Sequence, residues 1–180
     1  MQKTWFITGA TSGLGLEMTQ QLLADGQKVI ATARRPEALE QLRRDHSAQL
    51  DILPLDLTEP DSIAPAIEGA FARHQRVDVI VSNAGYGLFG AAEELTRAQI
   101  DRQIATNLAG SIHLIRAALP FLRRQGGGRI MGNLLDSSSF PRAAVPPRRM
   151  CNHFHPTVPN PTRLLIQLGF PSQDQRVDAG

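Results

Sequence analysis

A glycine-rich segment near the start of this 180-residue chain has the composition of a phosphate-binding loop. Residues 8–15 read Thr-Gly-Ala-Thr-Ser-Gly-Leu-Gly. Glycine adopts backbone conformations that other residues avoid, and its lack of a side chain lets an anion approach the main chain closely. A helix that begins in such a loop adds unpaired N–H groups and the positive end of its dipole. The alternative is a tight turn with incidental glycines, and the flanking elements decide between the two interpretations.

The stretches on either side of this segment have the patterns of a strand and a helix. Residues Thr4–Thr8 form a short apolar run that is typical of a buried parallel strand. A helix is predicted over Gly13–Asp25, where Leu14, Met18 and Leu22 recur at every fourth position and would form its apolar face. A strand, a glycine loop and a helix in this order favour the phosphate-binding interpretation.

The same alternation continues along the chain and predicts an α/β fold. Further strands are predicted at Lys28–Ala33, Leu50–Leu55, Val77–Val81 and Arg129–Asn133, with helices from Pro36, over Glu59–His74 and over Thr96–Arg124. Strands that are apolar on both faces and separated by helices indicate a parallel sheet covered on both sides. Right-handed crossovers then give a Rossmann-like, doubly wound sheet with its ligand crevice at the carboxyl ends of the strands.

Three further motifs follow the predicted third and fourth strands and lie on the last helix. They are Asp56-Leu57, Ser82-Asn83-Ala84-Gly85, and Asn107 within Thr-Asn-Leu-Ala-Gly. Together with residues 8–15 they resemble, in order and spacing, the motifs of classical members of the short-chain dehydrogenase/reductase family. One departure is Ser82, which stands where the family motif has the first Asn of Asn-Asn-Ala-Gly.

The resemblance implies a role for each motif. It implies that Asp56 contacts an adenine ring, that Asn83 holds neighbouring strands together, and that Asn107 supports a proton relay. Taken alone, Asp56 could cap a turn before Glu59, and Asn107 could mark a helix irregularity. The cofactor-binding residues that we expect are Gly9, Ser12, Gly13, Leu14, Gly15, Arg34, Arg35, Asp56, Leu57, Asn83, Ala84 and Gly85.

The end of the second predicted strand favours NADP(H) over NAD(H). A site for NAD places an acidic side chain there, which accepts hydrogen bonds from the ribose 2′-hydroxyl. This chain has Arg34 and Arg35 instead. A guanidinium group can pair with a 2′-phosphate, which a carboxylate would repel. The alternative is that both arginines are solvated loop charges beside Glu37.

The residues that carry the family's proton transfer have no match here. That chemistry uses a helical Tyr-x-x-x-Lys pair as acid or base, and a serine after the fifth strand. The only tyrosine is Tyr86, and the only lysines are Lys3 and Lys28. Ser137 is a candidate for the serine, although a serine run in a proline-rich segment is more often a solvated loop. Asn107, in a supporting role, is the one conventional catalytic residue that the sequence retains.

The composition changes near residue 133. Residues 1–133 contain 14 basic and 14 acidic side chains, whereas residues 134–180 contain five arginines, three aspartates and seven of the 12 prolines. Because proline disrupts helices and central strands, we expect a dinucleotide-binding Rossmann domain over 1–133 and an irregular, disordered tail over 134–180. The sheet would then be incomplete after its fifth strand. A frame shift near Gly128–Leu135, or a truncation followed by a new tail, would explain the change.

Other site classes and compartments are not favoured. Cys151, His153 and His155 lie close together, but without a second ligand cluster we expect no metal site. The arginines of the tail are too few to predict a nucleic-acid partner. The chain has neither an apolar run long enough to span a membrane nor the features of a signal peptide, so we expect a cytoplasmic protein.

These observations predict an NADP(H)-binding protein of the short-chain dehydrogenase/reductase type. By resemblance, its reaction is hydride transfer between NADP(H) and a small carbonyl or secondary-alcohol substrate. Without the Tyr and Lys pair we expect the chain to be inactive. The alternative is a non-catalytic NADP(H)-binding sensor or interaction module.

Overall fold

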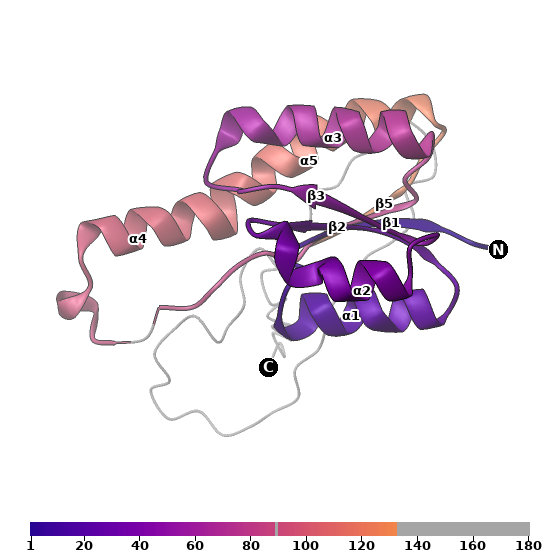
Figure 1. The fold of residues 1–180 in the computed structure, drawn as a ribbon. Coiled ribbons are helices and arrows are strands. Elements are labelled where there is room, and N and C mark those ends of the chain that lie inside the picture. Colours follow the sequence, from indigo (N-terminus) through magenta and orange to yellow (C-terminus); the bar gives the residue numbers. More distant parts are fainter. Residues whose placement is uncertain (89, 133–180) are drawn as a thin grey trace, which may run out of the picture.

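A parallel five-stranded sheet forms the centre of the protein (Figure 1). The computed structural model describes residues 1–88 and 90–132, so the predictions for residues 134–180, Ser137 included, lie outside the described part. The strand order is β3-β2-β1-β4-β5, which confirms the predicted doubly wound, Rossmann-like fold. The strands are β1 (Thr4–Thr8), β2 (Lys28–Ala33), β3 (Leu50–Pro54), β4 (Val79–Ser82) and β5 (Arg129–Gly132).

Helices cover both faces of this sheet, as Figure 1 shows. One face carries α1 (Gly13–Ala24) and α2 (Glu40–Asp45), and the other carries α3 (Pro60–His74) and α5 (Gly110–Arg124). Short 3₁₀ turns, η1 (Pro36–Leu39) and η2 (Ala92–Glu94), precede α2 and α4. The long helix predicted over Thr96–Arg124 is observed as α4 (Arg97–Ile104), a π-helical turn η3 (Ala105–Ala109) and α5. Of these, α4 extends beyond the edge of the sheet.

Alternate residues along each central strand fill two separate cores. On the side of α3 and α5, strand residues pack with helix residues in one cluster that includes Phe6, Ile30, Ile80, Ile63, Ile67, Leu114 and Leu122. On the side of α1 and α2, the second cluster includes Ile7, Val29, Val79, Val81, Leu23 and Leu39. Burying each aliphatic side chain contributes about 1.5–3 kcal/mol, so the two cores are the main stabilising feature of the sheet.

The apolar face predicted for α1, which also had Leu23 beside it, was wrong at Leu14, whose side chain is 69% exposed. Met18 and Leu22 are partly buried against the core, and Leu23 is buried with Gly15 and Thr19. The cause is the close approach of the helix to the loop after β1, which only a small residue at position 15 permits. The hydroxyl of Thr19 donates to the Gly15 carbonyl at 2.7 Å and is thereby satisfied inside the core.

The apolar residues of the last helix do not all face the core. Ile100, Ile104, Leu108 and Ile112 are 38–50% exposed, although the periodicity placed them on one apolar face with the residues that follow. Farther along the same predicted series, Ile115 and Leu122 are buried on α5, together with Leu114. The exposed residues lie on α4, on η3 and in the first turn of α5, and α4 projects beyond the sheet while α5 lies on it (Figure 1).

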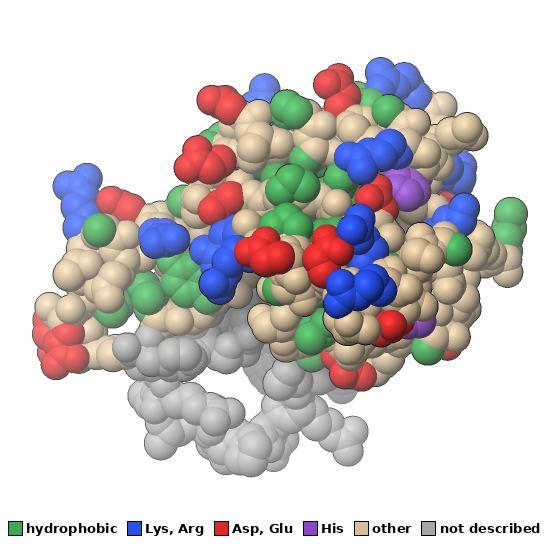
Figure 2. All heavy atoms as spheres, in the orientation of Figure 1, with side chains coloured by type: hydrophobic (Ala, Val, Ile, Leu, Met, Phe, Trp, Pro, Cys, Tyr) green, Lys and Arg blue, Asp and Glu red, His purple; other side chains and the backbone are tan. Residues whose placement is uncertain are grey.

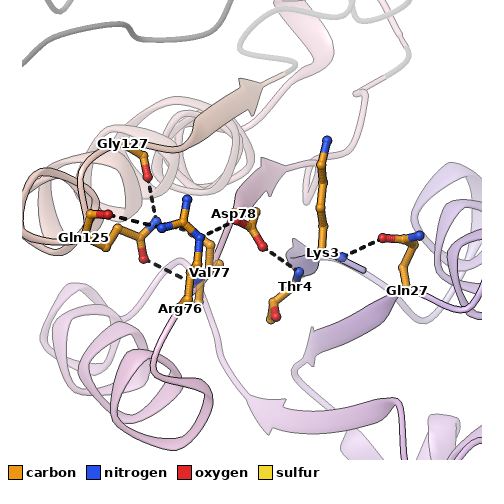
Figure 3. A network of polar contacts seen from close by, with 8 residues as sticks. All are labelled: Lys3, Thr4, Gln27, Arg76, Val77, Asp78, Gln125 and Gly127. Atoms are coloured by element: carbon orange, nitrogen blue, oxygen red, sulfur yellow. Dashed lines mark hydrogen bonds and ion pairs between the residues drawn. The ribbon is translucent and has the colours of Figure 1, made fainter. Parts of the chain in front are cut away.

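A polar network ties the amino-terminal ends of the strands together (Figure 3). The carboxylate of Asp78 accepts hydrogen bonds from the Thr4 N–H at 2.9 Å and from the Arg76 Nε at 2.6 Å. At the end of α5, the amide of Gln125 accepts from the Val77 N–H at 3.2 Å and donates to the Val77 carbonyl at 2.7 Å. These bonds fix β4 against β1 and against the turn that leads into β5.

We predict that Asp78→Ala lowers the free energy of unfolding by about 1–3 kcal/mol, because it leaves a backbone donor without its charged acceptor. Chemical denaturation followed by circular dichroism would measure the change. The matched control is Arg97→Ala, which removes a 3.5 Å ion pair whose arginine is 94% exposed. That control should change stability by a few tenths of a kcal/mol at most. Equal stability of the two variants would contradict the role given to Asp78.

Candidate functional site

A cleft of about 630 Å³ opens at the carboxyl ends of the central strands. Its walls come from the loop after β1, the end of β2, the turn after β3, the loop after β4, and the adjoining helix α4 with η3. In a doubly wound sheet this is where the strand order reverses and where ligands bind. The fold therefore places the candidate site where the sequence predicted it.

The glycine loop forms the floor of this cleft. Gly9 has φ +69°, and a side chain there would lie 2.9 Å from the Ala84 Cα. Gly13 has φ +54° and begins α1. Ser12 occupies the N-cap without a capping bond from its hydroxyl, and the first turn of α1 carries no acidic residue. The helix start therefore offers its amide groups and positive dipole end to an anion.

Thr8 and Asn83 join the end of β1 to the end of β4. The buried hydroxyl of Thr8 accepts from the Asn83 N–H at 2.9 Å and from the Ala84 N–H at 3.0 Å, and it donates to the Val81 carbonyl at 3.3 Å. In return, the Asn83 side-chain amide donates to the carbonyls of Thr8 at 3.0 Å and Gly9 at 3.3 Å. These bonds hold the glycine loop against the fourth strand, the strand-joining role expected for Asn83.

Asp56 is the acidic residue of the cleft. Its Oδ1 accepts from the Thr58 N–H at 2.9 Å and from the Thr58 hydroxyl at 2.8 Å. Burial by itself would raise the pKa of Asp56, but these hydrogen bonds and the positive charges of Arg34 and Arg102 together hold that pKa below its usual value of 3.8. The carboxylate is therefore ionised at neutral pH. The backbone carbonyl of Asp56 accepts from the Glu59 N–H at 3.1 Å, so Asp56 lies in a turn before Glu59, and its carboxylate caps that turn through the Thr58 N–H.

Asn107 lies within the π-helical turn η3, so the helix irregularity that it suggested is present. Its Oδ1 accepts from the Tyr86 N–H at 3.1 Å, and its Nδ2 donates to the Tyr86 carbonyl at 2.8 Å. Gln103 adds a bond to the same carbonyl at 3.2 Å. Both polar ends of the Asn107 side chain thus hold the loop after β4 in place.

Most of the predicted cofactor residues lie together in the cleft. Two of them do not line it: Gly15 lies behind the loop, and Arg35 is the N-cap residue of η1. The predicted cofactor residues that line the cleft are Gly9, Ser12, Gly13, Leu14, Arg34, Asp56, Leu57, Asn83, Ala84 and Gly85. The predicted supporting residue Asn107 lines it as well. Segments that are far apart in the sequence therefore converge on one site.

Comparison with known proteins agrees with this geometry. The family described as "short chain dehydrogenase" matches residues 3–132. The chain belongs to this family. Among curated relatives, oxidoreductase BOA17 of Botryotinia fuckeliana is 37% identical over 131 residues, covering 72% of this chain and 48% of that protein. The 3-ketodihydrosphingosine reductase of Bacteroides thetaiotaomicron is 33% identical over 125 residues, covering 69% of this chain and 44% of that protein.

Solved structures of short-chain dehydrogenases share the fold. One from Streptomyces avermitilis matches with a TM-score of 0.69 and 37% identity, over 72% of this chain and 47% of that one. A metagenomic short-chain oxidoreductase in complex with NADP matches with a TM-score of 0.66 and 34% identity, over 71% of this chain and 60% of that one. The chain thus spans about half the length of the relatives that it matches.

Several cleft residues of this family member were not predicted from the sequence. Thr8 ends β1 and is the first residue of the glycine-rich segment. A hydroxyl side chain at the buried end of a strand, next to a loop, could have indicated a group that joins this loop to a neighbouring strand. Gln99, Arg102 and Thr106 follow one another at helical spacing on α4 and η3 and form a wall of the cleft. Their polar pattern was a usable signal, but only the observed position of α4 shows that this face meets the site.

Two other site classes can be considered for the described part of this family member. Within residues 1–88 and 90–132, no helix is both long and apolar enough to cross a membrane. The same residues contain no group of three or more His, Cys, Asp or Glu side chains placed to hold a metal ion. Cys151, His153 and His155 lie outside this part of the chain.

We predict that Gly15→Ala destabilises the protein by about 1–3 kcal/mol, because the added methyl group would collide with the Gly9 carbonyl and lie 2.5 Å from the Asn83 Nδ2. The control is Gly69→Ala within α3, where the nearest atom is 4.0 Å away. It should stabilise the helix by up to about 1 kcal/mol. Denaturant unfolding of both variants would test this, and a Gly15→Ala protein as stable as the wild type would contradict the packing described here.

Proposed function

We propose that the cleft binds NADP(H) through the glycine loop, the Asp56 turn and the arginine at the end of β2. The observation that carries this proposal is the convergence of three features on one cleft. These are an uncapped helix start behind a glycine loop, an ionised carboxylate at Asp56, and Arg34 where an NAD site would have an acid. The solved relatives that contain NADP or 5-hydroxy-NADP support the proposal.

The residues of the cleft divide the work of binding. The pyrophosphate would lie at the first turn of α1, where Ser12 and Gly13 present amide groups. Asp56 and Leu57 would hold the adenine, and Arg34 would pair with the 2′-phosphate. Asn83, Ala84 and Gly85 would support the nicotinamide half from the end of β4. When bound, the dinucleotide supplies a hydride donor or acceptor at its nicotinamide ring.

Preference for NADP(H) over NAD(H) follows from charge. Arg34 lines the cleft at the end of β2, where an NAD site would have an acid, so this end of the cleft favours the dinucleotide that carries a 2′-phosphate. The family accepts both cofactors, as the NADH complex of a Brucella melitensis 3-ketoacyl-(acyl-carrier-protein) reductase illustrates. The choice in this chain therefore depends on its own arginines.

We further propose that the 180-residue chain binds the dinucleotide without turning over a carbonyl or alcohol. Its one tyrosine, Tyr86, is joined through its backbone to Asn107, and no lysine follows Lys28. Asn107 could support a proton relay, but the residue that would transfer the proton is not in the chain. For an intact site of this type, the expected reaction is hydride transfer between NADP(H) and a small carbonyl or secondary alcohol.

The affinity test uses titration calorimetry of the full chain with NADP⁺ and with NAD⁺. We expect NADP⁺ to bind more tightly, and Arg34→Gln to reduce that preference roughly tenfold, about 1.4 kcal/mol, while leaving NAD⁺ affinity unchanged. The control is Arg43→Gln, an exposed arginine that pairs with Glu40 on α2. If neither dinucleotide binds the wild type, the proposed function is wrong.

The activity test follows the nicotinamide absorbance of NADPH in the presence of a panel of ketones and aldehydes. We expect no carbonyl-dependent oxidation above the rate in buffer, because general acid–base groups contribute about 10²–10⁴ in rate and the usual pair is absent from the sequence. Turnover that Asn107→Ala abolishes would show that the chain has a rebuilt catalytic site and would overturn the proposal.

A further inference from the structure

The cleft contains a second arginine besides Arg34. Arg34 follows β2, whereas Arg102 comes from α4, and both line the same cleft as Asp56. Asp56 is the only acid among the described residues that line it. Figure 2 shows Lys and Arg side chains gathered where α4 meets the body of the molecule, with acidic side chains beside them.

Neither guanidinium is committed to an ion pair within the described residues. The ion pairs there involve other basic residues, namely Arg43, Arg73, His74, Arg76 and Arg97. The acid next to Arg102 in the sequence, Asp101, lies 3.5 Å from Arg97 instead. Arg102 therefore stands at the cleft with its donors available to a ligand.

The carboxylate of Asp56 is arranged to leave one oxygen for the same ligand. Both hydrogen bonds from Thr58 go to Oδ1, so Oδ2 keeps its acceptor capacity. The positive charge of Arg102, like that of Arg34, lowers the pKa of Asp56, which shows that the guanidinium is close enough for its charge to act on this carboxyl. The cleft lining thus holds a free acceptor at Asp56 and a free donor at Arg102.

We propose that Arg102 is a further binding residue for the adenine base, beside Asp56, which the family resemblance already places there. Adenine carries an exocyclic amine, which is a donor, next to the ring nitrogen N1, which is an acceptor. Asp56 Oδ2 matches the amine, and the Arg102 guanidinium donates to N1. Hypoxanthine presents a carbonyl oxygen in place of the amine and would face the carboxylate with an acceptor.

This inference rests on the proposed dinucleotide function and assigns the two arginines different tasks. Arg34 would contact the 2′-phosphate, which NADP⁺ has and NAD⁺ lacks. Arg102 would contact the base, which both dinucleotides share. Loss of Arg102 should therefore weaken both ligands by one factor, while loss of Arg34 should change only their ratio.

Calorimetric titration of the full chain with NADP⁺, NAD⁺ and nicotinamide hypoxanthine dinucleotide tests the assignment. For Arg102→Gln we expect about three- to tenfold weaker binding of both adenine dinucleotides, with their ratio unchanged. The preference of NAD⁺ over the hypoxanthine analogue should fall in the same variant. Arg102→Lys keeps the charge but not the planar fork, and it should recover only part of the loss. Arg97→Gln, on the same helix, should bind like the wild type.

The outcomes separate the two levels of the proposal. If the wild type binds the dinucleotides and the Arg102→Gln variant binds each of them as tightly as the wild type does, the role of Arg102 is overturned and the dinucleotide function stands. A loss confined to NADP⁺ would place Arg102 at the 2′-phosphate and would also overturn its role at the base. Full recovery in Arg102→Lys would show that charge alone matters, which contradicts base recognition. Circular dichroism spectra of each variant would confirm that the fold is retained.

Discussion

At the end of β1, the buried hydroxyl of Thr8 accepts two backbone N–H groups from the end of β4 and donates to a third residue, Val81. Parallel strands carry no turn that joins their ends directly, so side chains must fix how the loops after them lie relative to one another. Here the hydrogen bonds of Thr8 hold Gly9 close to Ala84. The side-chain amide of Asn83 adds two more bonds, to the carbonyls of Thr8 and Gly9. The floor of the cleft and the position of the glycine loop both depend on this contact.

The electrostatics of the cleft contrast with those of the domain. Residues 1–133 are neutral overall, yet the cleft walls contain two arginines and one carboxylate. A local excess of positive charge inside a concave surface attracts an anionic ligand more strongly than the same charge spread over an open face. Asp56 remains ionised in these surroundings because hydrogen bonds and the neighbouring cations together outweigh the effect of burial.

Strands and loop motifs could be read from the sequence, but the placement of helices could not. The strands β1 and β2 occur over the predicted residues, because a short, unbroken apolar run next to turn residues is typical of a buried parallel strand. On α1 the prediction failed at Leu14, because that residue lies at the cleft, where exposure does not follow core periodicity. Arg102 was missed for a related reason: its polar spacing with Gln99 and Thr106 shows a polar helix face, but only the tertiary position of α4 places that face at the cleft.

The π-helical turn η3 lies between a helix that forms a wall of the cleft and a helix that packs on the sheet. An α-helix rotates by about 100° per residue, so one extra residue in a turn resets which side chains face a given direction without ending the helix. The two halves therefore face different surroundings: Gln99 and Arg102 line the cleft, while Leu114 and Leu122 pack in the core. Substitutions on α4 can change the lining of the cleft while the core face of α5 stays unchanged.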